Sequence, residues 1–298
     1  MVIKPFFYRL LRIHAFYNAF GKVHFLISSK PISQKNTSSL HPDDFLIITI
    51  AFNNVELIAQ QIESIKKHLT DSCYRHVIVD NSSDKNKRNQ IMEVCQAQNI
   101  EYKEVPYSLS LKFCHWISLF SMSHGIALNW AYYNVISPRS PKYFALLDHD
   151  ILPVKSCSFS SAIGDTDFYG VKRVRNGGWY IWPGWGVYKF QVFASGKVNF
   201  LPFFNKHVFF DTGGSNYKNI YAHYELQKIK FPMVKFHRLK TTNDLHTDDA
   251  IYHSDYIQSI DNAWIHLING SNYYQIQGKE QTIKNIINDI SFFEDINY

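Results

Sequence analysis

Two aspartates separated by one residue are the sharpest chemical feature of this 298-residue chain. Asp148 and Asp150 follow the apolar run Tyr-Phe-Ala-Leu-Leu, which is typical of a buried strand. In extended backbone two carboxylates at this spacing point the same way, and their charges repel each other. A hard divalent cation, Mg²⁺ or Mn²⁺, removes that conflict, because it favours carboxylate oxygens together with substrate phosphates. The alternative is a solvated turn in which both acids cap a helix.

Alternating strands and helices must position this pair. We expect strands at 45–52, 76–80, 102–105 and 142–148, and helices at 55–69, 85–98 and 113–136, the last broken near Gly125. Strands that alternate with helices form a mostly parallel sheet, whose ligands bind beyond the carboxyl ends of the strands. Asn53, Asp80 and Asp148 each follow such an end. Beyond residue 175 the chain reads as irregular and rich in Trp, Tyr, Phe and Gly.

Composition excludes several classes of protein. With 46% hydrophobic residues the chain can bury a large core, so disorder and a disulfide-stapled miniprotein are excluded. Of the 31 Lys and Arg, six lie in residues 1–42, which contain no acid, and the other 25 are balanced by 25 acidic residues. A nucleic-acid groove would spread its basic residues through the body of the protein. The fingerprints of dinucleotide and P-loop sites, G-x-G-x-x-G and the Walker loop, do not occur in the sequence.

The first 30 residues predict an amphipathic helix, and residues 31–43 a linker. One half of the helical wheel carries large apolar residues, namely Ile3, Phe6, Phe7, Leu10, Leu11, Ile13, Tyr17 and Phe20. The other half carries Lys4, Arg9 and Arg12. Such a helix suits the interface of an anionic membrane. The alternative is a helix packed on the body with a solvated basic face.

Cysteine spacing and hydropathy point to a compartment. The four cysteines show no C-x-x-C spacing, which fits a reducing cytosol and disfavours a zinc site. No apolar run approaches the ~20 residues that span a bilayer. Arg9 and Arg12 interrupt the apolar region that a secretory signal needs. We therefore expect a cytoplasmic protein, peripheral on the inner face of the membrane through residues 1–30.

Four segments, in this order, resemble motifs of the family 2 nucleotide-sugar glycosyltransferases. Thr-Ile-Ala-Phe-Asn53 resembles the V-P-x-Y-N end of the family's first strand, with Ile50 in place of the proline, and Val-Ile-Val-Asp80-Asn-Ser-Ser resembles its V-D-x-x-S turn. Ser-His-Gly125-Ile-Ala-Leu-Asn129 resembles a degraded N-x-G-x-x-x-x-N helix start, and Leu-Asp148-His-Asp150 matches L-D-x-D. The resemblance covers residues 45–170 and continues more loosely to 270.

The resemblance implies a GT-A fold, which is a Rossmann-like α/β fold with a mostly parallel central sheet flanked by helices. It places one large domain at 44–272, with a nucleotide-sugar-binding half at 44–174 and an acceptor-binding half at 175–272. Residues 273–298 are then a helical tail. The aromatic-rich second half forms the irregular part of this domain.

The resemblance also implies roles on the donor side. Phe52 and Asn53 would frame the nucleotide base, and Asp80, with Ser82 in its turn, would accept from a base N–H. Asp148 would lie by the ribose and the metal, and Asp150 would bind the metal. By their residue types alone, Asp80 is a turn-forming residue and Asn129, the remaining donor-side residue, is equally well a buried polar group of a helix.

On the acceptor side, a carboxylate must take the proton of the acceptor hydroxyl. Asp211, before Thr-Gly-Gly214, is the candidate base, narrowly preferred to the acidic pair Asp248 and Asp249. Three tryptophans in an aromatic loop could stack on sugar faces, with core packing as the alternative for at least one of them: Trp179, Trp182 and Trp185. By resemblance His266 completes the metal shell; a structural histidine is the alternative.

These features together predict a metal-dependent glycosyltransferase, and the resemblance implies that it is inverting. It would move a sugar from a nucleotide donor, expected to be a UDP-sugar, to a cell-surface glycan or a lipid-linked saccharide. Two alternatives stay open. A sugar-nucleotide nucleotidyltransferase shares a similar core but needs a Gly-rich basic loop after the first strand, where this chain has Phe-Asn-Asn-Val-Glu. A non-catalytic glycan- or membrane-binding protein on the same fold would bind neither a divalent ion nor a nucleotide.

Overall fold

The computed structural model describes residues 14–31, 45–106, 109–116, 119–194, 196–238 and 256–268, together with 281, 284 and 285. The first half of the chain contains α2 (His14–Ser28), β1 (Phe45–Ala51), α3 (Val55–His68), β2 (Tyr74–Asp80), α4 (Lys85–Ala97), β3 (Glu101–Glu104), α5 (Leu109–Trp116), α6 (Phe120–Ala131), a π-helical turn η1 (Tyr132–Ile136) and β4 (Tyr143–Asp148). The second half contains β5 (Ile151–Pro153), α7 (Phe159–Ile163), β6 (Phe168–Arg175), β7 (Gly178–Lys189), α8 (Phe190–Ala194), β8 (Phe203–Asn205), β9 (Val208–Phe210), α9 (Asn216–Asn219), η2 (Tyr221–His223), η3 (Leu226–Lys228), β10 (Ile229–Lys230), β11 (Val234–Arg238), β12 (Tyr256–Ile260) and β13 (Trp264–His266).

The central sheet has seven strands in the order β10-β6-β7-β4-β1-β2-β3. Strands β4, β1, β2 and β3 are parallel, β10 is parallel to β6, and β7 runs antiparallel to both β4 and β6. The predicted α/β class and the four predicted strands are therefore confirmed. As expected for a parallel sheet, the carboxyl ends of β1, β2 and β4 lie at one edge.

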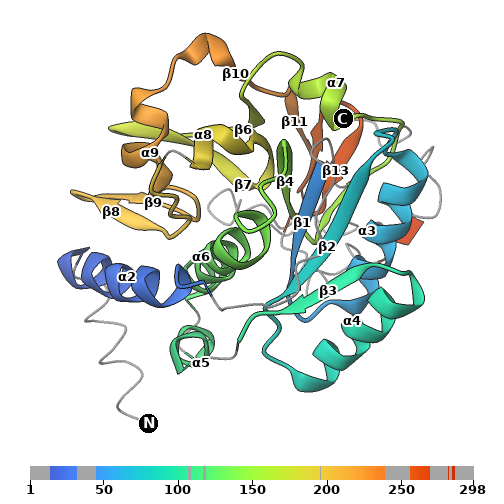
Figure 1. Ribbon diagram of the computed structural model, residues 1–298, viewed down its shortest axis with the longest axis horizontal. Coiled ribbons are helices and arrows are strands. Elements are labelled where there is room, and N and C mark those ends of the chain that lie inside the picture. The colour runs from blue at the N-terminus through green and yellow to red at the C-terminus, as the bar shows by residue number, and fades with distance from the viewer. Residues whose placement is uncertain are drawn as a thin grey trace.

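Helices cover both faces of this sheet (Figure 1). On one face α3 and α4 bury an aliphatic layer, in which Ile58 and Ile91 pack on Ala51 and Ile78. On the other face Leu46, Ile48 and Ile50 of β1 join the larger core that includes α6. Because successive strand residues point to opposite faces, a strand buried on both faces must be apolar throughout, as β1 is.

The long helix expected at 113–136 is divided, but not where the sequence suggested. Helix α5 ends at Trp116 and α6 begins at Phe120, whereas Gly125 lies inside α6. The prediction of a break near Gly125 was wrong. A Cβ there would come within 2.8 Å of the carbonyl oxygen of Phe200, so the glycine permits close packing.

The aromatic stretch predicted as a loop is the long strand β7, and the loop prediction was wrong. Its backbone pairs with β4 on one side and β6 on the other, so it is a central strand of the sheet. The predicted boundary at 174/175 falls at the end of β6, in the hairpin that connects these neighbouring strands. The division into a donor half and an acceptor half stays a prediction.

A second sheet of four strands has the order β11-β12-β13-β5, and its strand β5 begins three residues after the end of β4 in the first sheet. Strand β13 is antiparallel to β5 and places His266 opposite Ile151. This pairing brings a residue from the far end of the described chain to within one position of Asp150.

Helix α2 packs on the body of the protein through Tyr17, Gly21, His24 and Phe25. It lies along β8 and α6 (Figure 1). Of the predicted apolar half, Tyr17 is buried and Phe20 packs against the core, as the alternative of a helix packed on the body expected. The outward face is not only basic, because the exposed Val23, Leu26 and Ile27 lie on it with Lys22 and Lys30. Residues 1–13 of the predicted amphipathic segment, and most of the linker and of the predicted tail, lie outside the described residues. No helix in the described part of the chain combines the length and hydropathy of a membrane span.

Candidate functional site at the carboxyl edge of the sheet

Hydrogen bonds to three other parts of the chain hold the turn that carries the two aspartates. Gln61 of α3 donates from its side-chain amide to the carbonyls of Asp148 (2.8 Å) and Ile151 (2.7 Å). The backbone N–H of Leu267 donates to the carbonyl of Asp150 (2.9 Å), and the His149 ring donates to the carbonyl of Ile50 (3.3 Å). These hydrogen bonds fix the backbone between β4 and β5. The positions from which both carboxylate side chains extend are therefore fixed as well.

Gln61 is itself held by a buried polar chain beneath the turn. Thr49 donates to its carbonyl oxygen (2.7 Å) and contacts Nε2 of His76 (2.9 Å). All three side chains are buried. Burial, followed by the positive charge of Lys66, lowers the pKa of His76 to about 3, so this ring is neutral at physiological pH. A neutral ring can donate to the threonine hydroxyl, which leaves the hydroxyl proton for Gln61.

Asp148 forms an ion pair with His124 of α6, with 3.2 Å between Oδ1 and Nε2. Burial by itself lowers the pKa of His124, but the negative charges of Asp148, Asp211 and Asp150 outweigh it, and the pKa is raised. The three carboxylates therefore act together on one imidazole. We call these three aspartates, with His124 and His266, the acidic edge.

Asp150 faces His266 across the two sheets, with 3.6 Å between Oδ2 and Nε2. The other ring nitrogen, Nδ1, lies 3.0 Å from Oε1 of Gln258, which is fully buried. A carbonyl oxygen only accepts, so Nδ1 carries a proton and Nε2 is the atom turned to the carboxylate. In the neutral ring that atom presents a lone pair, and a cation between the two groups would satisfy both.

The donor set fits a divalent cation that shares its coordination with a substrate. Two ligands at about 2.1 Å from one ion lie roughly 3–4 Å apart, which matches the separation of Asp150 and His266. Asp148 is turned to His124 instead, and the described residues contain no cluster of three or more His, Cys, Asp or Glu side chains able to hold a metal. Mg²⁺ typically takes one or two carboxylates and completes its shell with water and phosphate oxygens.

Strand β7 forms a wall of the site through Trp182. Its ring lies 4.8 Å from the His266 ring, and the Arg173 guanidinium lies 5.0 Å from its centre. The negative charges of Asp211 and Asp148 also act on the Arg173 guanidinium. A Cβ on Gly184 would come within 2.1 Å of Trp182 and 2.5 Å of Oδ2 of Asp148, so only glycine lets both side chains approach the strand here.

Asp211 reaches the same area from the turn after β9. Its Oδ1 accepts from the backbone N–H of Thr212 (2.7 Å), and the Thr212 hydroxyl donates to the carbonyl of Ser121 in α6 (3.0 Å). The side chain is half-buried. Within the described part of the chain its Oδ2 accepts no hydrogen bond, so this oxygen is free to take a proton from a ligand. The alternative bases, Asp248 and Asp249, lie outside the described residues.

Three of the predicted donor-side residues, Asn53, Asp80 and Ser82, meet in the turn after β2. Asn53, in a left-handed conformation (φ 52°), donates its backbone N–H to the Ser82 hydroxyl (2.8 Å). Asp80 is fully buried and accepts from the backbone N–H of Ser82 (2.8 Å) and from the Tyr102 hydroxyl (2.9 Å). Burial raises its pKa. Asp80 thus builds the turn, and its contact with a nucleotide base stays a prediction.

Phe52 and Asn129, which were also predicted on the donor side, differ in their burial. Phe52 is half-buried against His115 and Phe120. Asn129 is fully buried and accepts from the backbone N–H of Phe200 (2.8 Å), which is the structural position that its alternative reading expected.

Of the three tryptophans, Trp179 and Trp182 are half-buried. Trp179 stacks on Tyr221. Trp185 is only 1% exposed and packs between Tyr169 and Trp264, so it offers no face to a sugar in this structure.

Sequence reasoning missed four residues of this site: Gln61, His124, Arg173 and Gln258. Only Gln61 carried a usable signal, because it lies beside Ile58, Ile62 and Ile65 on the apolar stripe of its helix. A glutamine in that position is buried and must find partners. Arg173 belongs to an ordinary run of basic residues. His124 is a single histidine in an apolar helix, and that pattern does not indicate a functional site.

Neither a family model nor a curated protein matches the sequence. Among solved structures, S. aureus TarS aligns at 15% identity over 53% of this chain and 30% of that chain, with a TM-score of 0.35. The galactosyltransferase LgtC in complex with donor and acceptor sugar analogs aligns at 14% identity over 51% and 60%, with a TM-score of 0.34. The mannosyltransferase PcManGT from Pyrobaculum calidifontis, in complex with GDP-Man and Mn²⁺, aligns at 12% identity over 65% and 58%, with a TM-score of 0.35.

This chain spans less than two thirds of the length of each of these three proteins. At these TM-scores the likeness carries no conclusion about what the chain binds or transfers. The function proposed below is supported by the chain's own residues and their arrangement.

Proposed function

We propose that this protein is a nucleotide-sugar-dependent glycosyltransferase whose donor binds at the acidic edge. One observation carries the proposal: the turn bearing Asp148 and Asp150 is fastened by Gln61, Leu267 and Ile50 at the carboxyl edge of a parallel sheet. A solvated turn would need no such frame. Oriented carboxylates at this edge suit a phosphate-bearing ligand with its cation, and the sequence motifs of the family 2 transferases support the same reading.

Asp150 and His266 would hold the divalent cation, Mn²⁺ or Mg²⁺. When bound, this ion supplies Lewis-acid stabilisation of the charge that grows on a departing nucleotide diphosphate. Asp148, paired with His124, lies beside it and is placed for the ribose. Arg173, over the face of Trp182, adds a positive charge to the same wall.

Asp211 would act as the general base for an inverting displacement. Its Oδ2 can accept the proton of the acceptor hydroxyl while the hydroxyl oxygen attacks the anomeric carbon of the donor sugar and the bond from that carbon to the nucleotide diphosphate breaks. Trp182, half-buried and adjacent to the acidic edge, offers an aromatic face to the sugar. The donor is then a UDP-sugar, as the resemblance implies, and the acceptor a cell-surface glycan or a lipid-linked saccharide at the inner face of the membrane.

The donor half of this proposal is tested by thermal melting with a panel of nucleoside diphosphates, with and without Mn²⁺. A ligand that binds only the folded state stabilises it by about 2.7 kcal/mol at a hundred times its Kd. We expect UDP to raise the melting temperature only when Mn²⁺ is present. Asp150→Asn should abolish that rise, whereas Asp165→Asn, at an exposed position, should keep it.

Three other outcomes would contradict parts of the proposal. A rise with UDP that needs no metal, or that survives in Asp150→Asn, would remove the metal assignment. A response to nucleoside triphosphates rather than diphosphates would favour a nucleotidyltransferase. No response to any nucleotide would favour a non-catalytic binding protein. For the base, Asp211→Asn should lower the rate of sugar transfer while leaving the UDP response intact.

A further inference from the structure

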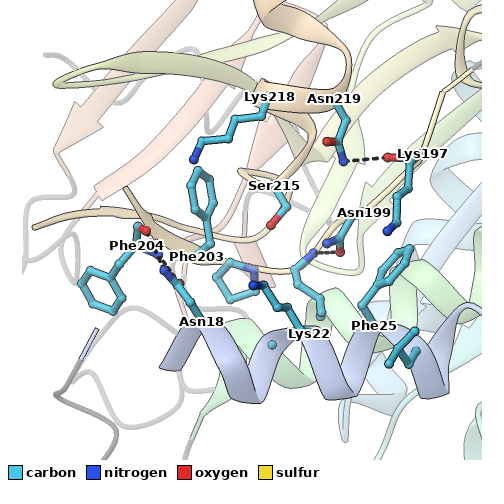
Figure 2. Close-up of a pocket in the computed structure, with 14 residues that line it drawn as sticks. Asn18, Lys22, Phe25, Lys197, Asn199, Phe203, Phe204, Ser215, Lys218 and Asn219 are labelled. Atoms are coloured by element: carbon cyan, nitrogen blue, oxygen red, sulfur yellow. Dashed lines mark hydrogen bonds between the residues drawn. The ribbon is translucent and has the colours of Figure 1, made fainter. Parts of the chain in front are cut away.

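A hollow lies between α2 and the segment 197–219, and its lining residues are different from those of the acidic edge. Its volume is about 610 Å³, which is the size of a small-molecule site. Lys22 enters from α2, and Lys197 and Lys218 enter from the opposite wall (Figure 2). We call this hollow the lysine pocket. Among the described residues that line it, none is acidic.

The three ammonium groups are available to a ligand. Each lysine is exposed, and within the described part of the chain none of them pairs with a carboxylate. Lys197 lies 4.9 Å from the centre of the Phe25 ring and Lys218 lies 5.2 Å from that of Phe203. These cation–π contacts hold two of the charges at the wall of the pocket without neutralising them.

The frame of the pocket is ordered by side-chain amides. Asn18 of α2 exchanges two hydrogen bonds with the backbone of Phe204, both of 2.8 Å, which ties the helix to β8. Asn219 donates to the carbonyl of Lys197 (2.8 Å), and Asn199 accepts from the backbone N–H of Leu201 (3.0 Å). The two walls therefore stand at a fixed distance before any ligand arrives.

The outer surface of α2 beside the pocket is apolar. Val23, Leu26 and Ile27 are 55%, 61% and 47% exposed, and Leu26 also lines the pocket. Residues 14–31 contain no acid, and Lys22 and Lys30 flank the three apolar side chains. An exposed apolar strip bounded by lysines matches an interfacial helix rather than an ordinary solvated one.

We propose that the lysine pocket and the apolar strip of α2 together bind an anionic phospholipid of a membrane surface. The phosphate headgroup would enter among Lys22, Lys197 and Lys218, and the strip would insert beside it among the acyl chains. The lysine pocket adjoins the apolar strip at Leu26. One lipid can therefore contact the pocket with its anionic head and the strip with its apolar tails. This inference concerns a different part of the molecule and does not depend on glycosyl transfer.

The test is sedimentation of the full-length protein with lipid vesicles. Vesicles containing phosphatidylglycerol should bind the protein much more tightly than vesicles of phosphatidylcholine alone. A basic residue near an anionic surface contributes about fivefold in affinity, so Lys22→Gln/Lys197→Gln/Lys218→Gln should weaken binding about a hundredfold. The matched variant Lys85→Gln/Lys87→Gln/Lys235→Gln changes the net charge equally at exposed positions elsewhere and should weaken it only slightly.

The apolar half has its own variant. Val23→Ser/Ile27→Ser replaces two exposed side chains and should weaken vesicle binding even at high salt, where the contribution of the lysines is screened. Equal losses in the two lysine variants, or wild-type binding that ignores phosphatidylglycerol, would overturn the proposal.

Soluble glycerol phosphate separates the lipid from a diffusible phosphate. Binding of this compound as tight as that of vesicles would overturn the lipid assignment and point to a free phosphate or a saccharide phosphate. The response to UDP and Mn²⁺ should stay unchanged in the pocket variant. Loss of vesicle binding and loss of nucleotide binding are thus separate failures, one of this inference and the other of the proposed function.

Discussion

The acidic edge and the lysine pocket hold their charges in opposite ways. At the acidic edge, Asp150 is about one-tenth exposed and faces His266 on short side chains, above a buried frame of hydrogen bonds. In the lysine pocket the ammonium groups stand on long exposed stems without a carboxylate partner in the described structure. Short charged side chains must be positioned by the backbone, whereas lysines reach their ligand from several backbone positions.

This difference separates two kinds of recognition. A reaction requires atoms in a fixed geometry, and the turn at Asp148, held by hydrogen bonds from several elements, meets that requirement. Attraction to a charged surface requires only that like charges gather and remain unpaired. Substitutions in the frame of the acidic edge should therefore affect folding, and substitutions in the lysine pocket should not.

The largest effect is expected from Gln61→Leu. The change removes the donors to the buried carbonyls of Asp148 and Ile151 and leaves Thr49 without its acceptor. Each unsatisfied buried group costs about 1–3 kcal/mol, so we expect the free energy of unfolding to fall by about 3 kcal/mol. Urea denaturation measures it. Gln90→Leu, on an exposed position of α4, is the matched control and should change it by less than about 0.5 kcal/mol.

A medium effect is expected from pH through His76. Its pKa is lowered to about 3 in the folded protein by burial and by Lys66, against about 6.5 in the unfolded chain. The unfolded state therefore binds the extra proton, and this contribution to stability is complete above pH 6.5 and lost as the pH falls toward 3. At pH 5 the loss amounts to about 2 kcal/mol.

His76→Gln isolates this contribution, because glutamine does not titrate. Between pH 7 and pH 5 the wild type should lose about 2 kcal/mol more free energy of unfolding than the variant. His223→Gln, at an exposed position, should lose as much as the wild type. Parallel pH profiles of the wild type and His76→Gln would show that His76 is not held neutral beneath the turn.

The smallest effect on folding is expected from the triple lysine variant of the pocket. Lys22, Lys197 and Lys218 are exposed and have no carboxylate partner among the described residues, so their replacement by Gln should change the free energy of unfolding by less than about 0.5 kcal/mol per site. Any increase in the free energy of unfolding should be small, because it would come only from the loss of repulsion between the three like charges. A large loss would mean that these lysines hold the pocket together, and the contrast with the acidic edge would disappear.

Local pattern was enough to predict much of the fold. The apolar runs at β1, β2 and β4 and the helical spacing of α3 and α4 appear in the structure within a few residues of their predicted bounds. The place of Asp148 at the end of a parallel strand followed from the alternation of elements. Strand β7 was missed because its tryptophans and glycines lack the period-two alternation, and pairing on both sides decided its conformation.

What the sequence by itself determined is the order of the elements and the pair of carboxylates at the edge of the sheet, because both depend on neighbours along the chain. The tertiary structure alone decided which side chains surround that pair. Gln61, His124 and Arg173 come from three separate elements, and no local spacing relates them. His266, on a fourth element, was suggested only by the resemblance.

The same holds for the two surfaces of α2. The helical wheel assigns Tyr17 to an apolar half, but it cannot say whether that half packs on the protein or meets a membrane. Contacts with β8 and α6 buried Tyr17 and Phe25 and left Val23, Leu26 and Ile27 outside. Lys22 meets Lys197 and Lys218 only because the chain returns to this helix about 180 residues later, and burial of apolar surface, a non-local interaction, is what brings it back.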